Sequence, residues 1–296
     1  MNEKYLKWDE VPYAGESSPP TNPVEPRAGS WKLTFLRRDW RGNFYSPTGR
    51  RLRLPIKNPN EINWDEELKV EQDTLKNTTK ETRDIAVYYG TGVPTKQWTP
   101  VIDRLIDTYG VSPTRAARIL AAVHNAINDT MIVVWFLKFK WNVARPNQYD
   151  QKMKTIVCTP RFPAYPSGHA TMSGCAEVVL SYFFPGEANK LRELGDINAL
   201  SRLYGGFHFP ADNDEGLELG RYIGNVIVDY LKNQRDSDLE PIDRPYQEYR
   251  NTKVDPIDYQ QFIPFDFLDN CPSLVMDEFK NNTSTVQNVS KPKLFF

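Results

Sequence analysis

The strongest constraint on the fold of this chain is a long amphipathic stretch that begins at Ser112 and Pro113. Serine is a favoured helix N-cap and proline a favoured first helical residue, so a helix is expected to start here. Apolar residues then recur at three- and four-residue steps as far as about Phe139, which is the spacing of one helix face turned toward a core. This stripe consists of Ala116, Ile119, Leu120, Val123, Ile127, Met131, Val134 and Trp135.

Other helices are expected on both sides of this one. The first begins near Trp64 or Asp65 and runs to about Tyr89, where a glycine-rich stretch ends it. Later helices are expected from Ser167 to about Tyr182, from 188 to 204 and from 211 to 233, with Pro185, Gly186, Gly205 and Gly206 between them. Six or so main helices predict an all-α bundle.

The chain divides into three parts by composition. Most of the 23 prolines lie outside the middle of the chain, whereas alanine and leucine concentrate in it. We therefore expect an irregular N-terminal arm over 1–60, a helical catalytic domain over 61–235 and an extended C-terminal arm over 236–296. The short alternating runs 31–36 and 51–56 predict a hairpin in the first arm.

Aromatic residues in the C-terminal arm need a surface to pack on, either in the same subunit or in a neighbour. They are Tyr246, Tyr249, Tyr259, Phe262, Phe265 and Phe267. A homodimer formed through the arms is the resulting hypothesis.

Composition argues against several classes of protein. The 37 basic and 38 acidic residues give a net charge of -1, which does not favour a nucleic-acid binder. Three cysteines without a CxxC pair argue against a disulfide framework and a structural zinc site, and favour a reducing compartment. The charged first ten residues do not resemble a secretory signal, and the strongest apolar run, 131–137, is too short to cross a membrane. We expect a soluble, cytoplasmic protein without a membrane span.

Lys138 is the first candidate functional residue, because it lies on the apolar stripe of the long helix. A buried ammonium group needs an anionic partner. The alternative is a lysine near a helix end whose stem is buried and whose charge reaches solvent.

Two further segments combine residue types that bind anions. Ser167, Gly168 and His169 stand at an expected helix start, where free backbone N–H groups and the helix dipole favour an anion. Arg202, followed by His208 and Asp212, supplies a cation, an imidazole and a carboxylate able to orient that imidazole. Each short motif could also be structural, and His124 on the long helix is interpreted as a packing residue.

Together these segments resemble a known signature in three parts. Lys138 with Arg145 and Pro146, the run 166–169, and Ser201-Arg202 with His208 and Asp212 occur in the order found in the vanadium haloperoxidase and type 2 phosphatidic acid phosphatase superfamily. Over roughly residues 60 to 235 the chain is most similar to the bacterial haloperoxidase branch, because of the run 162–171, Trp135, the run 88–92 with Trp98, and the run 204–209.

The resemblance implies a four-helix core around a bound oxyanion, vanadate or phosphate. It implies that Lys138, Arg145, Ser167, Gly168 and Arg202 hold the oxyanion and that His208 is the ligand of its central atom. Cationic side chains and backbone N–H groups are suitable donors for such a charge. Asp212 then orients His208, and His169 acts as acid and base.

The resemblance leaves two activities open. In the first, the cofactor is vanadate, the substrates are hydrogen peroxide and a halide, and Trp135 and Phe162 line the halide side. In the second, an acid phosphatase without a cofactor hydrolyses a phosphoester through a phosphohistidine at His208. Trp135 and Phe162 favour the peroxidase, although both could simply pack in the core. Arg161 and Ala144 depart from the pattern, since proline and an aromatic residue are common there, and Arg161 is placed in the pocket.

Overall fold

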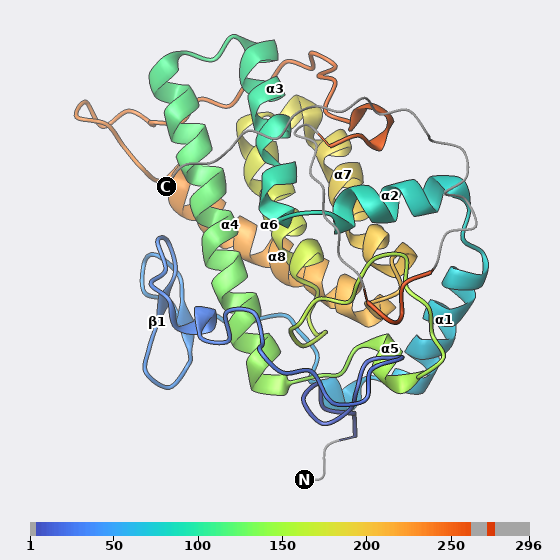
Figure 1. Cartoon of the computed structure of the whole chain (residues 1–296). Helices are drawn as coiled ribbons and strands as arrows, with labels where there is room; N and C mark the ends of the chain where they lie inside the picture. Colours follow the sequence, from blue (N-terminus) through green and yellow to red (C-terminus); the bar gives the residue numbers. More distant parts are fainter. Residues whose placement is uncertain (1–3, 262–270, 276–296) are drawn as a thin grey trace, which may run out of the picture.

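A computed structural model of the chain describes residues 4–261 and 271–275. Within these ranges the fold is all-α, as predicted, with eight α-helices and one two-stranded sheet (Figure 1). The helices are α1 (Trp64–Lys76), α2 (Lys80–Gly90), α3 (Thr99–Tyr109), α4 (Pro113–Trp141), α5 (Pro146–Tyr149), α6 (Gly168–Phe183), α7 (Ala188–Tyr204) and α8 (Pro210–Lys232).

Helix α6 forms the centre of the bundle and packs against α4, α7 and α8. Its contact with α8 is close because glycines remove side chains from the interface. A Cβ atom built on Gly220 would lie 2.0 Å from the carbonyl oxygen of Thr171, and one built on Gly174 would lie 2.7 Å from that of Leu217. The close approach brings the N-terminal ends of α6 and α8 together, where Ser167 N donates to Asp212 O at 2.8 Å.

Helix α4 is the long helix expected from the apolar stripe, and it extends to Trp141. It is the only helix in the described residues that is long and apolar enough to cross a membrane, but 61% of its most apolar window is buried inside the protein. A core helix of a soluble protein has the same character. The soluble state therefore stays a prediction.

Two predictions about the helices were wrong. The single helix expected from residue 64 to 89 is two helices, because Thr79 starts a new one: its hydroxyl accepts from Thr82 N, and the Thr82 hydroxyl accepts from Thr79 N. Helix α3 was not predicted. It begins at Thr99 with Pro100 in its first turn, a position at which proline is tolerated in a helix.

The predicted hairpin exists, but in a different place. Its strands are β1 (Arg37–Arg38) and β2 (Phe44–Tyr45), which lie between the two runs expected to pair. The arm is fastened to α4 by Asp129, whose fully buried carboxylate accepts the backbone N–H groups of Thr34, Phe35 and Leu36 at 2.7 to 2.8 Å. The run 31–36 is therefore not a strand: its backbone is bound to α4, and the ring of Phe35 packs against Tyr230 of α8 with centroids 6.2 Å apart.

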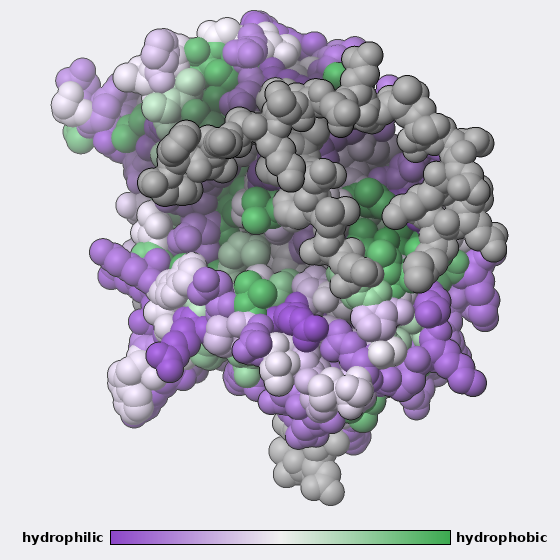
Figure 2. Space-filling model, viewed as in Figure 1, coloured by the Kyte–Doolittle hydropathy of each residue, from purple (hydrophilic) through white to green (hydrophobic). Residues whose placement is uncertain are grey.

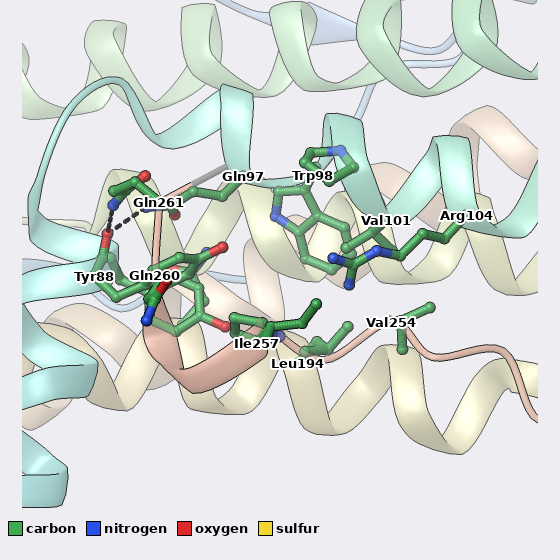
Figure 3. A pocket seen from close by; sticks show the side chains of 14 residues that line it. Tyr88, Gln97, Trp98, Val101, Arg104, Leu194, Val254, Ile257, Gln260 and Gln261 are labelled. Atoms are coloured by element: carbon green, nitrogen blue, oxygen red, sulfur yellow. Dashed lines mark hydrogen bonds between the residues drawn. The ribbon is translucent and has the colours of Figure 1, made fainter. Parts of the chain in front are cut away.

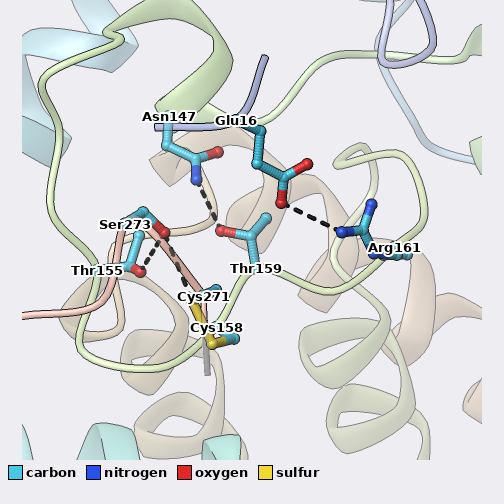
Figure 4. Close-up of a disulfide and its surroundings, with 8 residues drawn as sticks. All are labelled: Glu16, Asn147, Thr155, Cys158, Thr159, Arg161, Cys271 and Ser273. Carbon is cyan, nitrogen blue, oxygen red and sulfur yellow. Dashed lines mark hydrogen bonds and ion pairs between the residues drawn. A yellow bond between two sulfur atoms is a disulfide. The ribbon is translucent and has the colours of Figure 1, made fainter. Parts of the chain in front are cut away.

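The cysteine prediction was also wrong, because Cys158 and Cys271 form a disulfide bond (Figure 4). The two residues are 113 positions apart, and spacing in the sequence gives no sign of such a pair. Cys175 is buried and free. Since disulfides are typical of oxidising compartments, the cysteines no longer support a reducing compartment.

The C-terminal arm packs on the same subunit as far as it is described. Tyr246 stacks on Phe184 with ring centroids 5.5 Å apart, and Tyr259 contacts Tyr88 at 6.0 Å. Phe262, Phe265 and Phe267 lie outside the described residues. The division at residues 60 and 235 and the homodimer stay predictions.

Candidate active site

Four helix ends and one loop converge on a single site. Lys138 lies in the last turn of α4, and Arg145 lies in the loop between α4 and α5. The start of α6, the end of α7 and the start of α8 contribute the other expected residues, which are Ser167, Gly168, His169, Arg202, His208 and Asp212. The structure thus brings together residues that are up to 74 positions apart in the chain.

Lys138 is fully buried, so its charge does not reach solvent. Its ammonium group donates to the carbonyl oxygens of Pro163 at 2.8 Å and Ala164 at 2.5 Å. Ala164 N in turn donates to Val143 O at 2.9 Å. Lys138 therefore holds the loop before α6 against the end of α4.

Arg145 is also fully buried and is held on several sides. Its Nε donates to Phe162 O at 3.0 Å and its Nη1 to Phe207 O at 2.9 Å, whereas Nη2 has no hydrogen-bond partner. The backbone of Arg145 is fixed by Gln148, whose side-chain oxygen accepts from Arg145 N at 2.8 Å. Gln148 also donates to Trp8 O at 2.7 Å, so the N-terminal arm helps to position this arginine.

Arg202, at the end of α7, is likewise buried and has one guanidinium nitrogen without a hydrogen-bond partner. It is 1% exposed, and its Nε donates to the Ser201 hydroxyl at 2.9 Å. Its Nη1 lies 3.3 Å from His169 Nε2, and its Nη2 has no hydrogen-bond partner. Leaving buried guanidinium N–H groups unpaired is costly, so an acceptor is expected at each of them.

His208 lies two residues before α8 and is oriented by Asp212, which lies in the first turn of that helix. His208 Nδ1 lies 2.6 Å from Asp212 Oδ2, which also accepts from Phe209 N at 3.0 Å. When Nδ1 carries the proton, Nε2 keeps its lone pair. That nitrogen lies 2.8 Å from Arg145 Nη1. The lone pair of His208 is thus free of a proton and accepts from a guanidinium group.

The start of α6 supplies backbone N–H groups and a second histidine. Ser167 is the N-cap, and its hydroxyl accepts from Ala170 N at 3.4 Å. His169 Nε2 lies 3.0 Å from the carbonyl oxygen of Tyr89 and 3.3 Å from Arg202. One nitrogen cannot donate to the first and accept from the second at once, so these two contacts belong to different protonation states of His169.

A cavity of about 930 Å³ opens onto these residues. Gly168, His169, Arg202 and His208 line its inner end, and the face shown in Figure 2 is visibly hollowed, with apolar side chains in the hollow. The other predicted pocket residues, Trp135, Phe162 and Arg161, also line it. Ala144 is buried and is not among the lining residues.

Trp135 and Phe162 form a pair in the cavity wall, with ring centroids 4.9 Å apart. Phe162 also lies beneath two cations, since Lys138 Nζ is 5.2 Å and Arg145 Cζ is 5.0 Å from the ring centroid. Arg161 lies near the mouth and pairs with Glu16 of the N-terminal arm, its Nη2 lying 3.2 Å from Oε1 (Figure 4).

Burial lowers the pKa of all three buried cations, and the charge of Arg145 lowers the pKa of the other two further. Desolvation, followed by the charge of Arg145, holds the pKa of Lys138 well below its usual range. Desolvation lowers the pKa of Arg145 to about 10 and, together with the charge of Arg145, lowers the pKa of Arg202 to about 9. An anion placed among these groups would reverse both effects.

The pKa values of the two histidines are lowered by burial and by the same cations. Desolvation and the neighbouring cations, Arg202 for His169 and Arg145 for His208, hold the pKa of each imidazole well below its usual range. Burial raises the pKa of Asp212 to about 7, although the charge of Lys138 opposes this. Both histidines are therefore neutral in the site without an anion.

The donor set fits an oxyanion and does not resemble a site for a metal cation. Two unpartnered guanidinium nitrogens, a third buried cation and the start of a helix all favour negative charge. Among the described residues, no group of three histidine, cysteine, aspartate or glutamate side chains could hold a metal ion. Vanadate, which carries its metal inside an oxyanion, fits this set as well as phosphate does.

Several residues near the site were not predicted. Glu71 of α1 is fully buried with both oxygens unpartnered, and its pKa is raised well above its usual range by desolvation and by the charge of Asp212. Cys158 and Cys271 line the cavity, as does Tyr13 of the N-terminal arm. The sequence could not predict these residues, because a buried carboxyl on a charged helix and side chains from irregular arms follow no periodic pattern. His124 does not line the cavity.

Comparison with known proteins supports the same grouping. Residues 119–236 match the PAP2 superfamily model, and this range contains every residue of the signature. No curated protein matches the sequence.

Two solved structures share the fold. A bacterial vanadium-dependent iodoperoxidase is similar with a TM-score of 0.59 and 23% identity over 78% of this chain and 62% of its own. A bacterial vanadium-dependent chloroperoxidase in its apo form is similar with a TM-score of 0.58 and 14% identity over 79% of this chain and 63% of its own. This chain thus spans less than two thirds of either protein.

Proposed function

The chain belongs to the PAP2 superfamily, and from that premise we propose that it is a vanadate-dependent haloperoxidase that oxidises a halide with hydrogen peroxide. The observation that carries the proposal is the pair of buried, unpartnered guanidinium nitrogens of Arg145 and Arg202 in the same site as the unprotonated Nε2 of His208, which accepts from Arg145 Nη1. Such a group can hold a tetrahedral oxyanion and bond to its central atom. The aromatic pair Trp135 and Phe162 favours peroxidase chemistry over phosphate transfer.

Each part of the site has a role in holding the oxyanion. Arg145, Arg202 and Lys138 would neutralise its charge, and the Ser167 hydroxyl and the Gly168 N–H would donate at the start of α6. His208 Nε2 would occupy the position of the metal ligand. Bound vanadate would supply the centre at which hydrogen peroxide becomes reactive toward a halide.

His208 can act as a ligand only when its Nε2 lone pair is available. Asp212 provides this by accepting the proton of Nδ1, which fixes the tautomer. Arg145 Nη1, which donates to Nε2 without an anion, would turn to the oxygens of the bound oxyanion. The loss of one hydrogen bond is offset by charge-assisted bonds to the anion.

His169 would move protons to and from the bound group. Its low pKa results from burial and from Arg202, so an anion beside it would raise that pKa and allow it to hold a proton. A histidine whose protonation follows the occupancy of the site is suited to general acid and base catalysis.

The halide would approach from the side of Trp135 and Phe162. Their rings line the cavity and exclude water from the region next to Lys138 and Arg145. A poorly hydrated anion such as a heavy halide can lie against ring edges while the cations behind them supply the attraction.

An acid phosphatase is the second candidate, and the size of the cavity favours it. About 930 Å³ is far more than a halide and peroxide need, and it would admit an organic phosphoester. His208 Nε2 would attack phosphorus as the bond to the leaving alcohol breaks, and His169 would give that alcohol its proton. Water would then cleave the phosphohistidine, releasing phosphate and freeing His208.

One experiment separates the two activities. The purified protein is incubated with vanadate and assayed for halide-dependent consumption of peroxide, and in parallel for hydrolysis of an aryl phosphate without vanadate. We expect activity in the first assay, and activity only in the second would refute the peroxidase. His208→Ala should abolish the activity, whereas His124→Ala, at the histidine outside the cavity, should retain it.

Solubility and assembly belong to the same proposal. We expect a soluble protein, because α4 is covered by the rest of the bundle over most of its apolar window. Sedimentation at micromolar concentration tests the homodimer, and a monomer would contradict it. Location in the cytoplasm depends on whether the bond between Cys158 and Cys271 persists there.

A further inference from the structure

A second pocket lies behind the wall that carries His169. It has a volume of about 230 Å³ and is formed by α3, α7, the end of α2 and the C-terminal arm (Figure 3). Tyr89 belongs to both places, since its carbonyl oxygen contacts His169 and the residue itself lines this pocket. None of the oxyanion-binding residues lines it.

Two buried side-chain oxygens in this pocket have no hydrogen-bond partner. Gln97 is 7% exposed and Asn198 is 1% exposed, and the unpartnered atoms are Gln97 Oε1 and Asn198 Oδ1. The orientation of the Gln97 amide is fixed, because its Nε2 donates to Tyr88 O at 3.0 Å (Figure 3). Turning the amide over would place its oxygen against a carbonyl oxygen. Gln97 therefore presents an acceptor that the protein does not satisfy.

Most of the remaining wall is apolar, with three aromatic rings, although Arg104, Gln260 and Gln261 also line it. Trp98, Val101 and Leu194 are buried in it, and Tyr88 adds a second ring beside Tyr89. Flat apolar walls of this kind pack well against an aromatic ring. They also disfavour a ligand that is polar all around.

The charge of the pocket favours a neutral ligand. Among the described residues that line it there is no aspartate, glutamate, lysine or histidine. Its one cation, Arg104, donates through Nη1 to Lys253 O at 3.2 Å and to Asp255 O at 2.9 Å. A buried cationic ligand would find no carboxylate among the described residues here, and Arg104 already uses one of its donors on two backbone carbonyl oxygens.

We propose that this pocket is a separate binding site for a small neutral aromatic molecule that donates a hydrogen bond, such as a phenol, to Gln97. Its single hydroxyl would satisfy Gln97 Oε1, with Asn198 Oδ1 as the alternative acceptor, and its ring would lie against Trp98. Because Tyr89 lines this pocket and its carbonyl oxygen contacts His169, an occupant of the pocket would touch a residue that holds His169. The site does not depend on the activity proposed for the oxyanion cavity.

The test measures binding without any turnover. Phenol is titrated into the complete protein by calorimetry, with toluene as a probe of the same shape without a donor and benzoate as an anionic probe. We expect saturable binding of phenol and weaker or no binding of the other two. If toluene or benzoate binds as well as phenol, or if phenol does not bind, the proposal is overturned.

Variants locate the bound ligand. Gln97→Met keeps the length of the side chain, and Tyr88 O keeps a donor in Gln261, whose Nε2 lies 2.6 Å away. Losing the hydrogen bond to Gln97 should weaken phenol about three- to tenfold while toluene binds no worse, and Asn198→Leu, at the alternative acceptor, should weaken it by less. Gln247→Met, at an exposed glutamine, is the matched control and should leave both affinities unchanged.

His208→Ala keeps this test independent of the proposed function. That variant should bind phenol like the unmodified protein, because His208 does not line this pocket. Phenol binding that is lost with His208 and unaffected at Gln97 and Asn198 would place the ligand in the oxyanion cavity and overturn the proposal.

Discussion

Replacing Asp212 by asparagine tests the electrostatic logic of the site. Asp212 is fully buried, and its Oδ2 accepts from His208 Nδ1 at 2.6 Å and from Phe209 N at 3.0 Å. Asparagine has nearly the same shape, and its amide oxygen can still accept from Phe209 N and from His208 Nδ1. It has no charge, however, so it holds the proton on Nδ1 less strongly and keeps the Nε2 lone pair less available as a ligand.

The upper limit of the effect follows from the hydrogen bond to His208 that loses its charge. A hydrogen bond to a charged group contributes about 1.5 to 3 kcal/mol, which corresponds to roughly a 10- to 150-fold weaker affinity for the oxyanion. Burial raises the pKa of Asp212 to about 7 in the site without an anion. Below that pH the unmodified protein also carries a neutral group here, so the difference between the two proteins should narrow as the pH falls through 7.

Calorimetric titration of vanadate, and separately of inorganic phosphate, measures this affinity without any catalytic step. Asp214→Asn is the matched control, because it removes the same charge from an exposed position two residues further along α8. Equal affinities for the unmodified protein and Asp212→Asn above pH 7 would refute the role given to this carboxylate. An equal loss in Asp214→Asn would show that only the net charge of the helix end matters.

Three further predictions concern other parts of the site. Arg202→Gln removes a buried cation with an unpartnered nitrogen, so phosphate should bind at least about tenfold more weakly by calorimetry. Above the ordinary pKa of glutamate, the free energy of unfolding of Glu71→Gln should exceed that of the unmodified protein by up to about 1.4 kcal/mol more for each pH unit. Urea unfolding measures this difference, and Glu66→Gln is the control. Replacing Cys158 and Cys271 by serine should lower the free energy of unfolding by roughly 3 to 5 kcal/mol, measured in the same way.

The sign for Glu71 follows from its raised pKa. The folded protein keeps this carboxyl protonated while the unfolded chain ionises it, so the unmodified protein loses stability as the pH rises. Glutamine does not titrate and removes that loss. A difference independent of pH would contradict the burial of Glu71. Unchanged binding of phosphate by Arg202→Gln, or unchanged stability of the double serine variant, would contradict the other two predictions.

The sequence predicted the helices best where one apolar face continues without interruption. Helix α4 and its last turn with Lys138 follow from a stripe with helical spacing. The break between α1 and α2 was missed because Thr79 and Thr82 form a local capping box inside a polar segment, where no apolar pattern exists to be interrupted. Propensity alone cannot separate one long polar helix from two short ones.

The residues of the site could be predicted from their chemistry, but the residues that position them could not. Arg145 is positioned by Gln148, which reaches the backbone of the N-terminal arm at Trp8. The cavity wall includes the disulfide between Cys158 and Cys271 (Figure 4). Such contacts join segments more than 100 residues apart without any periodic pattern, so only the folded chain reveals them.

The departure at Arg161 can now be judged by its surroundings. An unpaired arginine at the cavity mouth would attract organic phosphates and so favour the phosphatase. Arg161 is paired with Glu16, whose side chain is 19% exposed, and this ion pair offsets much of its charge. Of the other cations near the cavity, Lys138 and Arg145 lie against the ring of Phe162, and Arg202 lies beside His169. Selection of the substrate at the cavity mouth therefore depends more on the shape of the cavity than on charge. The strongest argument from sequence against a halide substrate, the charge of Arg161, is weakened accordingly.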